Sequence, residues 1–179
     1  MRRALLALAG ASALGVTALL LAGFFWPDVD REVDLGRVES FAPGTVTSFY
    51  RPVDGDGFRL LAPGETVENT CTIHNWSYPQ RLSGTVIHVV RLEDGEFRGL
   101  SGRSPHLGEM VPWRPDSLWE GVVGWFREPC HGDTYALDGT RVFGPAPRDL
   151  DRFDLRIDDG QVVVDVTAVT EGARRQSSP

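Results

Sequence analysis

The sequence predicts an all-β domain preceded by one N-terminal transmembrane helix. Short segments of alternating, β-branched residues are separated by turns that contain glycine, which is typical of antiparallel strands. No segment beyond residue 27 shows sustained helical periodicity. Residues 4–26 form an uncharged, mostly apolar run, which matches the ~20 residues that a membrane helix needs.

The chain has 179 residues and a formal net charge of −7. The residues that follow the apolar run suffice for one domain with its own core. An acidic balance argues against nucleic acid as a partner, because phosphate binding needs a basic surface. Two cysteines are too few for a disulfide framework or for a metal site made only of thiolates.

We expect residues 1–27 to be an uncleaved membrane anchor, with a cleaved signal peptide as the alternative. Secretory apolar regions are shorter, typically ~7–15 residues, and end at a small-residue cleavage site. Here the run ends in Trp26 and Pro27, an interfacial aromatic followed by a helix stop. Arg2 and Arg3 favour a cytoplasmic N-terminus. The sequence therefore predicts a single-pass protein of the cell membrane with its domain on the extracytoplasmic side.

The rest of the chain is assigned in order along the sequence. Residues 28–40 are polar and predict a tether or a first edge strand, residues 41–170 form the domain, and residues 171–179 are expected to be a disordered tail. Strands are predicted at residues 44–50, 57–61, 84–92, 97–100, 142–143, 153–157 and 162–166. The turns at 93–96 and 158–160 each predict a β-hairpin.

Three motifs lie between the fourth and sixth of these strands. The first is SPHLGE at residues 104–109, and the second is EPCHGD at residues 128–133, followed by Tyr135. The third is the proline-rich run GPAP, which consists of Gly144, Pro145, Ala146 and Pro147.

In this order the motifs resemble the two ligand boxes and the proline loop of Rieske iron–sulfur domains, and the resemblance covers about residues 33–166. In each family box the first cysteine and the histidine bind a 2Fe–2S cluster, and the remaining cysteines form a disulfide. The resemblance implies an antiparallel β-sandwich with an inserted, loop-rich, cluster-binding subdomain, here at about residues 101–148. The final strands are then expected to return to the base sheet.

Carried over by position, the ligand sites keep their histidines and lose their thiolates. His106 and His131 occupy the two imidazole positions, whereas Ser104 and Glu128 stand where the ligand cysteines belong. Oxygen donors are harder ligands than the thiolates that stabilise iron–sulfide cores. We therefore expect the 2Fe–2S cluster that the family implies to be absent.

The residues around the ligand positions also depart from the family. Glu109 replaces one disulfide cysteine, while Cys130 keeps the other. Asp133 replaces a serine that donates a hydrogen bond toward sulfide, and Tyr135 retains the aromatic residue. Whether Cys130 pairs with Cys71, the second cysteine of the chain, is left open, because sequence does not give the Cα separation.

Two further states of the site are considered. His106, His131 and Glu128 form a two-histidine, one-carboxylate set that suits mononuclear Zn or non-haem Fe, with Glu109 and Asp133 as outer acceptors. Alternatively, the loop tips form a polar cluster of imidazolium–carboxylate pairs. Three tryptophans between the boxes, Trp113, Trp119 and Trp125, either form a small core or a docking patch.

The resemblance implies a subunit of a quinol-oxidising or cytochrome-containing respiratory complex. Because a redox centre is not expected, the leading hypothesis is an accessory, structural subunit of an electron-transfer complex. The first alternative is a metal-binding or redox-active electron-transfer protein that uses His106, His131 and Glu128. The second is a general extracytoplasmic interaction module. No independent catalytic motif appears in the sequence.

Overall fold

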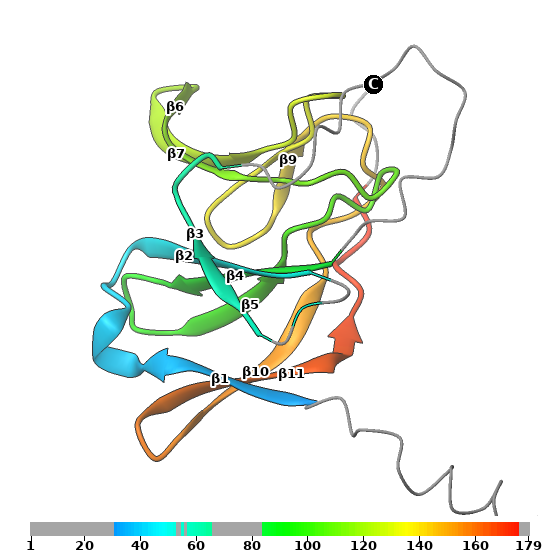
Figure 1. Ribbon diagram of the computed structural model, residues 1–179. Coiled ribbons are helices and arrows are strands. Elements are labelled where there is room, and N and C mark those ends of the chain that lie inside the picture. Colours follow the sequence, from blue (N-terminus) through cyan, green and yellow to red (C-terminus); the bar gives the residue numbers. More distant parts are fainter. Residues whose placement is uncertain (1–30, 53–54, 56, 66–83, 176–179) are drawn as a thin grey trace, which may run out of the picture. The chain divides into compact units, whose positions relative to one another are not determined.

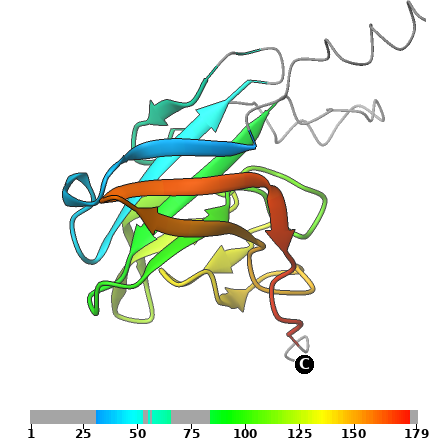
Figure 2. The same ribbon diagram turned by 90° about the horizontal axis from the view of Figure 1, so that it is seen from below.

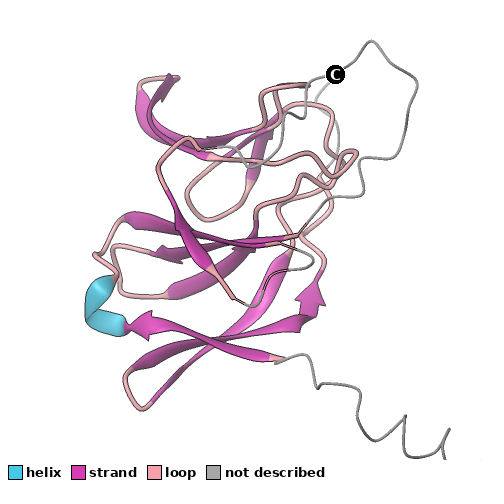
Figure 3. Ribbon diagram, in the orientation of Figure 1, coloured by secondary structure: helices cyan, strands magenta, loops and turns pink. Residues whose placement is uncertain are grey.

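A computed structural model of the chain describes residues 31–52, 55, 57–65 and 84–175. From Glu32 onward these residues belong to one compact unit that contains two antiparallel sheets (Figure 1). The described helical structure is one short 3-10 turn, η1, at Val38–Ser40 (Figure 3). No helix in the described part of the chain is long and apolar enough to cross a membrane. The predicted anchor at residues 1–27 lies outside the described residues.

The larger sheet has seven strands in the order β1-β11-β10-β5-β4-β2-β3. Its strands are β1 (Glu32–Arg37), β2 (Thr45–Arg51), β3 (Arg59–Leu61), β4 (Thr85–Arg91), β5 (Phe97–Ser101), β10 (Arg152–Asp158) and β11 (Gln161–Thr170). The smaller sheet has the order β6-β7-β8-β9, with β6 (Trp113–Trp119), β7 (Val122–Arg127), β8 (Thr134–Tyr135) and β9 (Arg141–Phe143). All strand pairs are antiparallel, so the all-β prediction is confirmed.

The larger sheet curls, so that two parts of the same sheet face each other (Figure 2). Strands β5 and β10 join these parts through only two paired positions, Arg152 with Leu100 and Phe153 with Gly99. Phe49 and Ile87 from one part pack with Val164 from the other in a buried apolar cluster. The sequence predicted two antiparallel layers, and in the structure the layers of the larger sheet are joined by the hydrogen bonds between β5 and β10.

Strand β4 is buried on both faces and lies between the two cores. Ile87 and Val89 point into the core within the curled sheet, whereas Val90 contacts the core shared with the smaller sheet. That second core contains Leu100, Phe126 and residues from the loops of the candidate site. A strand with two buried faces explains why residues 86–90 are apolar at every position except His88.

His88 is the one polar residue among the buried positions of strand β4, and it is fully buried. Its Nε2 atom is 2.9 Å from the carbonyl oxygen of Val111, and its Nδ1 atom is 2.7 Å from the hydroxyl of Ser48. A carbonyl only accepts, so Nε2 carries the proton and Nδ1 accepts from the hydroxyl. Burial lowers the pKa of His88 to about 4, which keeps the ring neutral.

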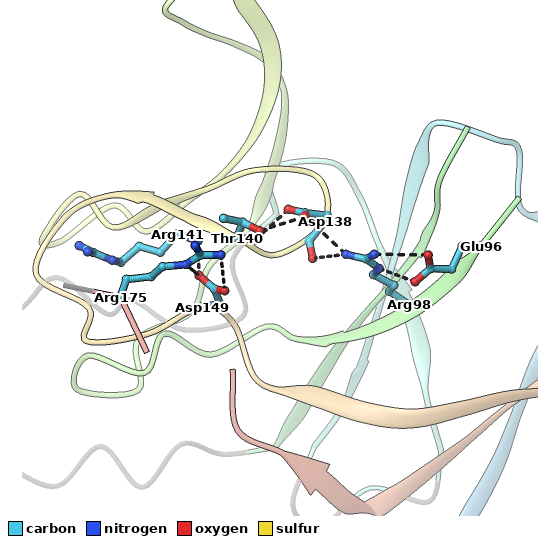
Figure 4. Close-up of polar contacts among 7 residues, drawn as sticks. All are labelled: Glu96, Arg98, Asp138, Thr140, Arg141, Asp149 and Arg175. Carbon is cyan, nitrogen blue, oxygen red and sulfur yellow. Dashed lines mark hydrogen bonds and ion pairs between the residues drawn. The ribbon is translucent and has the colours of Figure 1, made fainter. Parts of the chain in front are cut away.

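The C-terminal residues differ from the expected disordered tail. Residues 171–175 are described, and they pair with the chain next to the proline loop through Asp149 N to Ala173 O at 3.0 Å and Arg175 N to Pro147 O at 3.1 Å. The Arg175 guanidinium also donates two hydrogen bonds to the buried Asp149 carboxylate (Figure 4). Sequence reasoning missed this pairing because the segment is short and polar. Residues 176–179 lie outside the described residues.

Polar contacts also connect the larger sheet to the loop before β9. Arg98 on β5 donates to Glu96 at 2.7 Å and to the backbone carbonyl of Asp138 at 3.2 Å (Figure 4). The Asp138 side chain in turn accepts from the backbone and the hydroxyl of Thr140. These contacts fix the position of the chain that leads into the proline loop.

Candidate metal centre

The first loop of the site runs from β5 to β6 and is closed by its own backbone. Arg103 and Met110 form an isolated antiparallel bridge across its base. Ser104 N donates to the carbonyl of Glu109 at 2.8 Å, and Gly108 N donates to the carbonyl of Ser104 at 3.1 Å. This closure brings Ser104, His106 and Glu109 onto one tight turn.

The second loop connects β7 to β8 and is organised by a buried carboxylate. Glu128 is 1% exposed, and its two carboxylate oxygens accept hydrogen bonds from the backbone N–H groups of Cys130 and His131. The backbone of Glu128 closes the loop by donating to the carbonyl of Asp133 at 2.8 Å. Both Glu128 oxygens are therefore engaged in holding the loop that presents His131.

The two predicted histidines meet at the loop tips. The ring centroids of His106 and His131 lie 4.8 Å apart, with an interplanar angle of 90°. Each side chain is about one quarter exposed, yet both Nδ1 atoms are buried and lack a hydrogen-bond partner. The Nδ1 atom of each ring therefore points into the protein, and another part of the ring is exposed to solvent.

Carboxylate oxygens surround the two buried Nδ1 atoms. His106 Nδ1 is 3.8 Å from Asp133 Oδ2. His131 Nδ1 is 3.5 Å from Glu128 Oε2 and 3.7 Å from Glu109 Oε1. His106, His131 and Glu109 each offer one ligand atom, and these three atoms lie within 4.8 Å of one another.

Glu109 is the carboxylate of the site whose hydrogen bonding is incomplete. Its Oε2 atom is buried and has no hydrogen-bond partner. Burial raises the pKa of Glu109 above its ordinary value, and the nearby His131 opposes that rise. Among the three carboxylates of the site, Glu109 is thus the one with a buried oxygen that has no hydrogen-bond partner.

Ser104, Asp133 and Tyr135 form a fully buried polar network beneath the histidines. Ser104 Oγ donates to Asp133 Oδ2 at 2.6 Å and accepts from the backbone N–H of His106 at 3.0 Å. Since the single hydroxyl proton of Ser104 goes to the carboxylate, the Tyr135 hydroxyl at 3.1 Å donates to Ser104. Burial raises the pKa of Tyr135, so its hydroxyl keeps its proton.

The proline loop packs directly on Asp133. Ala146 N donates to Asp133 Oδ1 at 2.8 Å, and Ala146 is itself buried. Gly144 has a φ of +103°, and a Cβ built at this position would meet the Asp133 side chain and its Cα atom, the latter at 2.6 Å. Arg141 closes the loop by donating to the carbonyl of Gly144 at 2.6 Å. The loop therefore requires glycine for both its conformation and its close approach.

Cys130 lies at the tip of the second loop and is disulfide-bonded. The sequence contains one other cysteine, Cys71, which lies outside the described residues. A cysteine in a disulfide has no thiolate to offer a metal ion. Of the three tryptophans between the boxes, Trp125 is buried. Trp113 packs on buried Phe126 with ring centroids 4.9 Å apart, and Trp119 packs against Phe143.

The structure brings the predicted site residues from three loops into one place. The sequence did not indicate that Glu128 binds backbone N–H groups. It predicted Glu109 and Asp133 as outer acceptors beside the imidazoles, and the structure places Glu109 Oε1 3.7 Å from His131 Nδ1 and Asp133 Oδ2 3.8 Å from His106 Nδ1. Two imidazoles and one carboxylate form a donor set that can bind a divalent first-row metal ion.

Comparison with known proteins identifies relatives, although no protein-family model matches the chain. The cytochrome b6-f complex iron-sulfur subunit of Prochlorococcus marinus subsp. pastoris is 33% identical over 131 residues, which cover 66% of this chain and 70% of the relative. The chloroplastic subunit of Volvox carteri is 32% identical over 124 residues, covering 63% and 57%. For the chloroplastic subunit of Bigelowiella natans the identity is 34% over 88 residues, covering 48% and 32%.

The chain thus spans less than two thirds of two of these relatives, covering 32% of the Bigelowiella subunit and 57% of the Volvox subunit. Among solved structures, the plasma membrane Rieske protein of the cyanobacterium Synechocystis matches 44% of this chain and 75% of its own, with 28% identity and a TM-score of 0.36. The sequence identity to the Prochlorococcus subunit extends over more than two thirds of that relative. The chain belongs to the Rieske iron–sulfur protein family.

Proposed function

We propose that the chain is a membrane-anchored, structural Rieske-type subunit of a cytochrome-containing electron-transfer complex, and that it carries no 2Fe–2S cluster. Membership of the complex is supported by its relatives, which are named as iron-sulfur subunits of the cytochrome b6-f complex. Anchoring and an extracytoplasmic domain are supported by the apolar run at residues 4–26 and by the two arginines before it.

The observation that carries the cluster-less proposal is the donor set. A Rieske cluster needs two thiolates and two imidazoles, and the described residues of the site provide the imidazoles of His106 and His131. At the thiolate positions, the Ser104 hydroxyl is bonded to Asp133, and the Glu128 carboxylate is bonded to backbone N–H groups. The residues present do not fit the cluster that the family implies.

These oxygen atoms also hold the backbone of the two loops. Ser104 Oγ and the Glu128 carboxylate each accept a backbone N–H from the histidine of their own loop. The loops are consequently closed by hydrogen bonds from the side chains at the former ligand positions. This arrangement supports the proposal of a scaffold that is retained for its shape.

The proposal is tested by purifying the full chain from its native membranes in mild detergent, with an affinity tag as the handle. We expect haem-containing proteins to co-purify at a fixed ratio, and we expect iron and acid-labile sulfide to be absent from the tagged chain after it is separated from them. Acid-labile sulfide in the separated chain would refute the cluster-less assignment. Co-purification without any cytochrome would refute membership of the complex and leave the interaction-module hypothesis.

A further inference from the structure

We propose that His106, His131 and Glu109 form a binding site for one divalent metal ion, with Zn²⁺ as the favoured ion. The inference rests on the proposed absence of a cluster, because both would use the same two imidazole nitrogens. It differs from the set expected from sequence, in which Glu128 supplied the carboxylate.

The first argument comes from the buried atoms without partners. His106 Nδ1, His131 Nδ1 and Glu109 Oε2 are all buried and lack a hydrogen-bond partner. A buried polar atom without a partner costs about 1–3 kcal/mol, so such atoms call for an explanation. Here the three atoms belong to residues whose ligand atoms converge within 4.8 Å. A single metal ion between them would satisfy all three residues.

Direct hydrogen bonds from protonated His106 and His131 to the carboxylates explain the nitrogen–oxygen distances less well than a shared metal ion does. An imidazolium would donate from Nδ1 to a carboxylate at about 2.7–3.2 Å. The closest carboxylate oxygens are instead 3.8 Å from His106 and 3.5 and 3.7 Å from His131. The 3.7 Å between His131 Nδ1 and Glu109 Oε1 is close to the spacing of two ligand atoms around one ion, since the ligand atoms of a tetrahedral zinc site lie roughly 3.3–3.5 Å apart.

The choice of carboxylate follows from the hydrogen bonds already made. Glu128 uses one oxygen for the N–H of Cys130 and the other for the N–H of His131. Asp133 uses one oxygen for Ala146 N and the other for Ser104 Oγ. Glu109 is the acid with a buried oxygen that has no partner. Glu128 and Asp133 therefore act as positioning residues, and Glu109 as the third ligand.

The charge of the site also favours a cation. Glu109, Glu128 and Asp133 bring three carboxylates to a small, largely buried volume, and the last two are almost fully buried. In the described structure, the basic side chains that approach the carboxylates of Glu128 and Asp133 within 4 Å are those of His131 and His106. A divalent ion between the loops would offset the negative charge of the three carboxylates. Borderline nitrogen ligands and one carboxylate suit Zn²⁺ and Fe²⁺ better than Ca²⁺ or Mg²⁺.

The test uses the full chain in detergent, stripped with a chelator and then titrated with Zn²⁺ against a chromogenic competitor. We expect one zinc per chain. H106A, H131A and E109Q should each weaken zinc binding at least ten-fold, while E39Q, which changes an exposed glutamate outside the site, should bind as the wild type does.

Thermal unfolding with and without Zn²⁺ separates loss of the site from loss of the fold. Zinc should raise the melting temperature of the wild type and of E39Q, since a ligand that binds only the folded state stabilises it. The three site variants should melt cooperatively without zinc and gain no such shift. Equal zinc affinity in the wild type and H131A would overturn the proposal. Loss of binding in E128Q together with full binding in E109Q would overturn the assignment of Glu109.

The outcomes also distinguish this inference from the proposed function. A folded wild type that binds no zinc and contains no iron sinks the metal site but leaves the cluster-less subunit intact. Iron with acid-labile sulfide refutes both. Zinc binding together with co-purifying cytochromes supports both.

Discussion

Ser104 Oγ donates a 2.6 Å hydrogen bond to Asp133 Oδ2 across the two loops of the site. The two residues are 29 positions apart in sequence, and both side chains are buried. The family places a cysteine ligand and a serine at these positions, so an oxygen–oxygen hydrogen bond now joins loops that the family joins through a cluster. Because this bond involves no metal, its contribution to the free energy of unfolding can be measured in metal-free protein.

Removing the Ser104 hydroxyl should destabilise the domain. S104A leaves Asp133 Oδ2 and the N–H of His106 without their partner, and an unsatisfied buried group costs about 1–3 kcal/mol. Urea unfolding of the chelated protein should show a lower midpoint with an unchanged slope. S40A, at an exposed serine, is the control and should unfold as the wild type does. A wild-type midpoint in S104A would mean that the network adds no net stability.

Gly144 should tolerate no side chain. G144A introduces a Cβ against Asp133 and forces an L-residue to a φ of +103°. G95A is a matched control, because Gly95 has a φ of +90° but nothing within 4 Å of a built Cβ. Both variants carry the conformational cost of about 1–2 kcal/mol. Only G144A adds the clash, so its loss of unfolding free energy should exceed that of G95A. Equal losses in calorimetry would show that the proline loop can move away from Asp133.

Stability should depend on pH through His88. Burial lowers its pKa to about 4 from the ordinary 6.5. As pH falls from about 6.5 to about 4, the unfolded state takes up the proton and the folded state does not, so the free energy of unfolding falls by about 3 kcal/mol from this group. Above pH 6.5 both states are neutral and the effect vanishes.

The variant H88Q isolates this effect because glutamine can still donate to the Val111 carbonyl and does not titrate. H88Q should be less stable than the wild type at pH 7, owing to imperfect packing beneath Phe126. The gap between them should narrow as the pH is lowered to 4. Parallel curves of unfolding free energy against pH for the two proteins would rule out His88 as the source.

Restoring the sulfur donors should restore iron binding. The triple variant S104C/E128C/D133S recreates the two thiolate positions and the serine beside them, while His106 and His131 remain in place. After reconstitution with iron and sulfide under reducing conditions, we expect about two iron atoms and two sulfides per chain, the stoichiometry of a 2Fe–2S cluster. The wild type, treated in parallel, should contain neither. Iron and sulfide in both would show that oxygen donors suffice.

Much of the fold could be predicted because buried strands leave a clear pattern. The segment at residues 84–92 was assigned from its apolar, β-branched residues and corresponds to β4, and the two hairpin turns were placed correctly. Strand β6 was missed because it is half-exposed and contains Pro115 and Asp116, which disfavour a strand assignment. Strand β7 was also missed, and it too is partly exposed, because its first two residues are exposed valines.

The site was predicted only in outline, because the spacing of the motifs predicts which loops carry the site residues but not the hydrogen bonds that these residues make. The positions of His106 and His131 followed from the motifs. The roles of Glu109 and Glu128 did not, since they depend on which backbone N–H groups each carboxylate reaches after the loops close. Both residues are glutamates, so the sequence pattern would look the same if Glu109 held the backbone N–H groups and Glu128 kept the oxygen without a partner.

The pairing between the proline loop and residues 173–175 sets an order of events during synthesis. Asp133 is held by Ala146, and the chain that follows Ala146 is held in turn by Ala173 and Arg175. The contacts of residues 173–175 with the proline loop can therefore form only after these residues have left the ribosome. The loop that packs on Asp133, beneath His106 and His131, is thus completed by a segment that is synthesised more than 25 residues later.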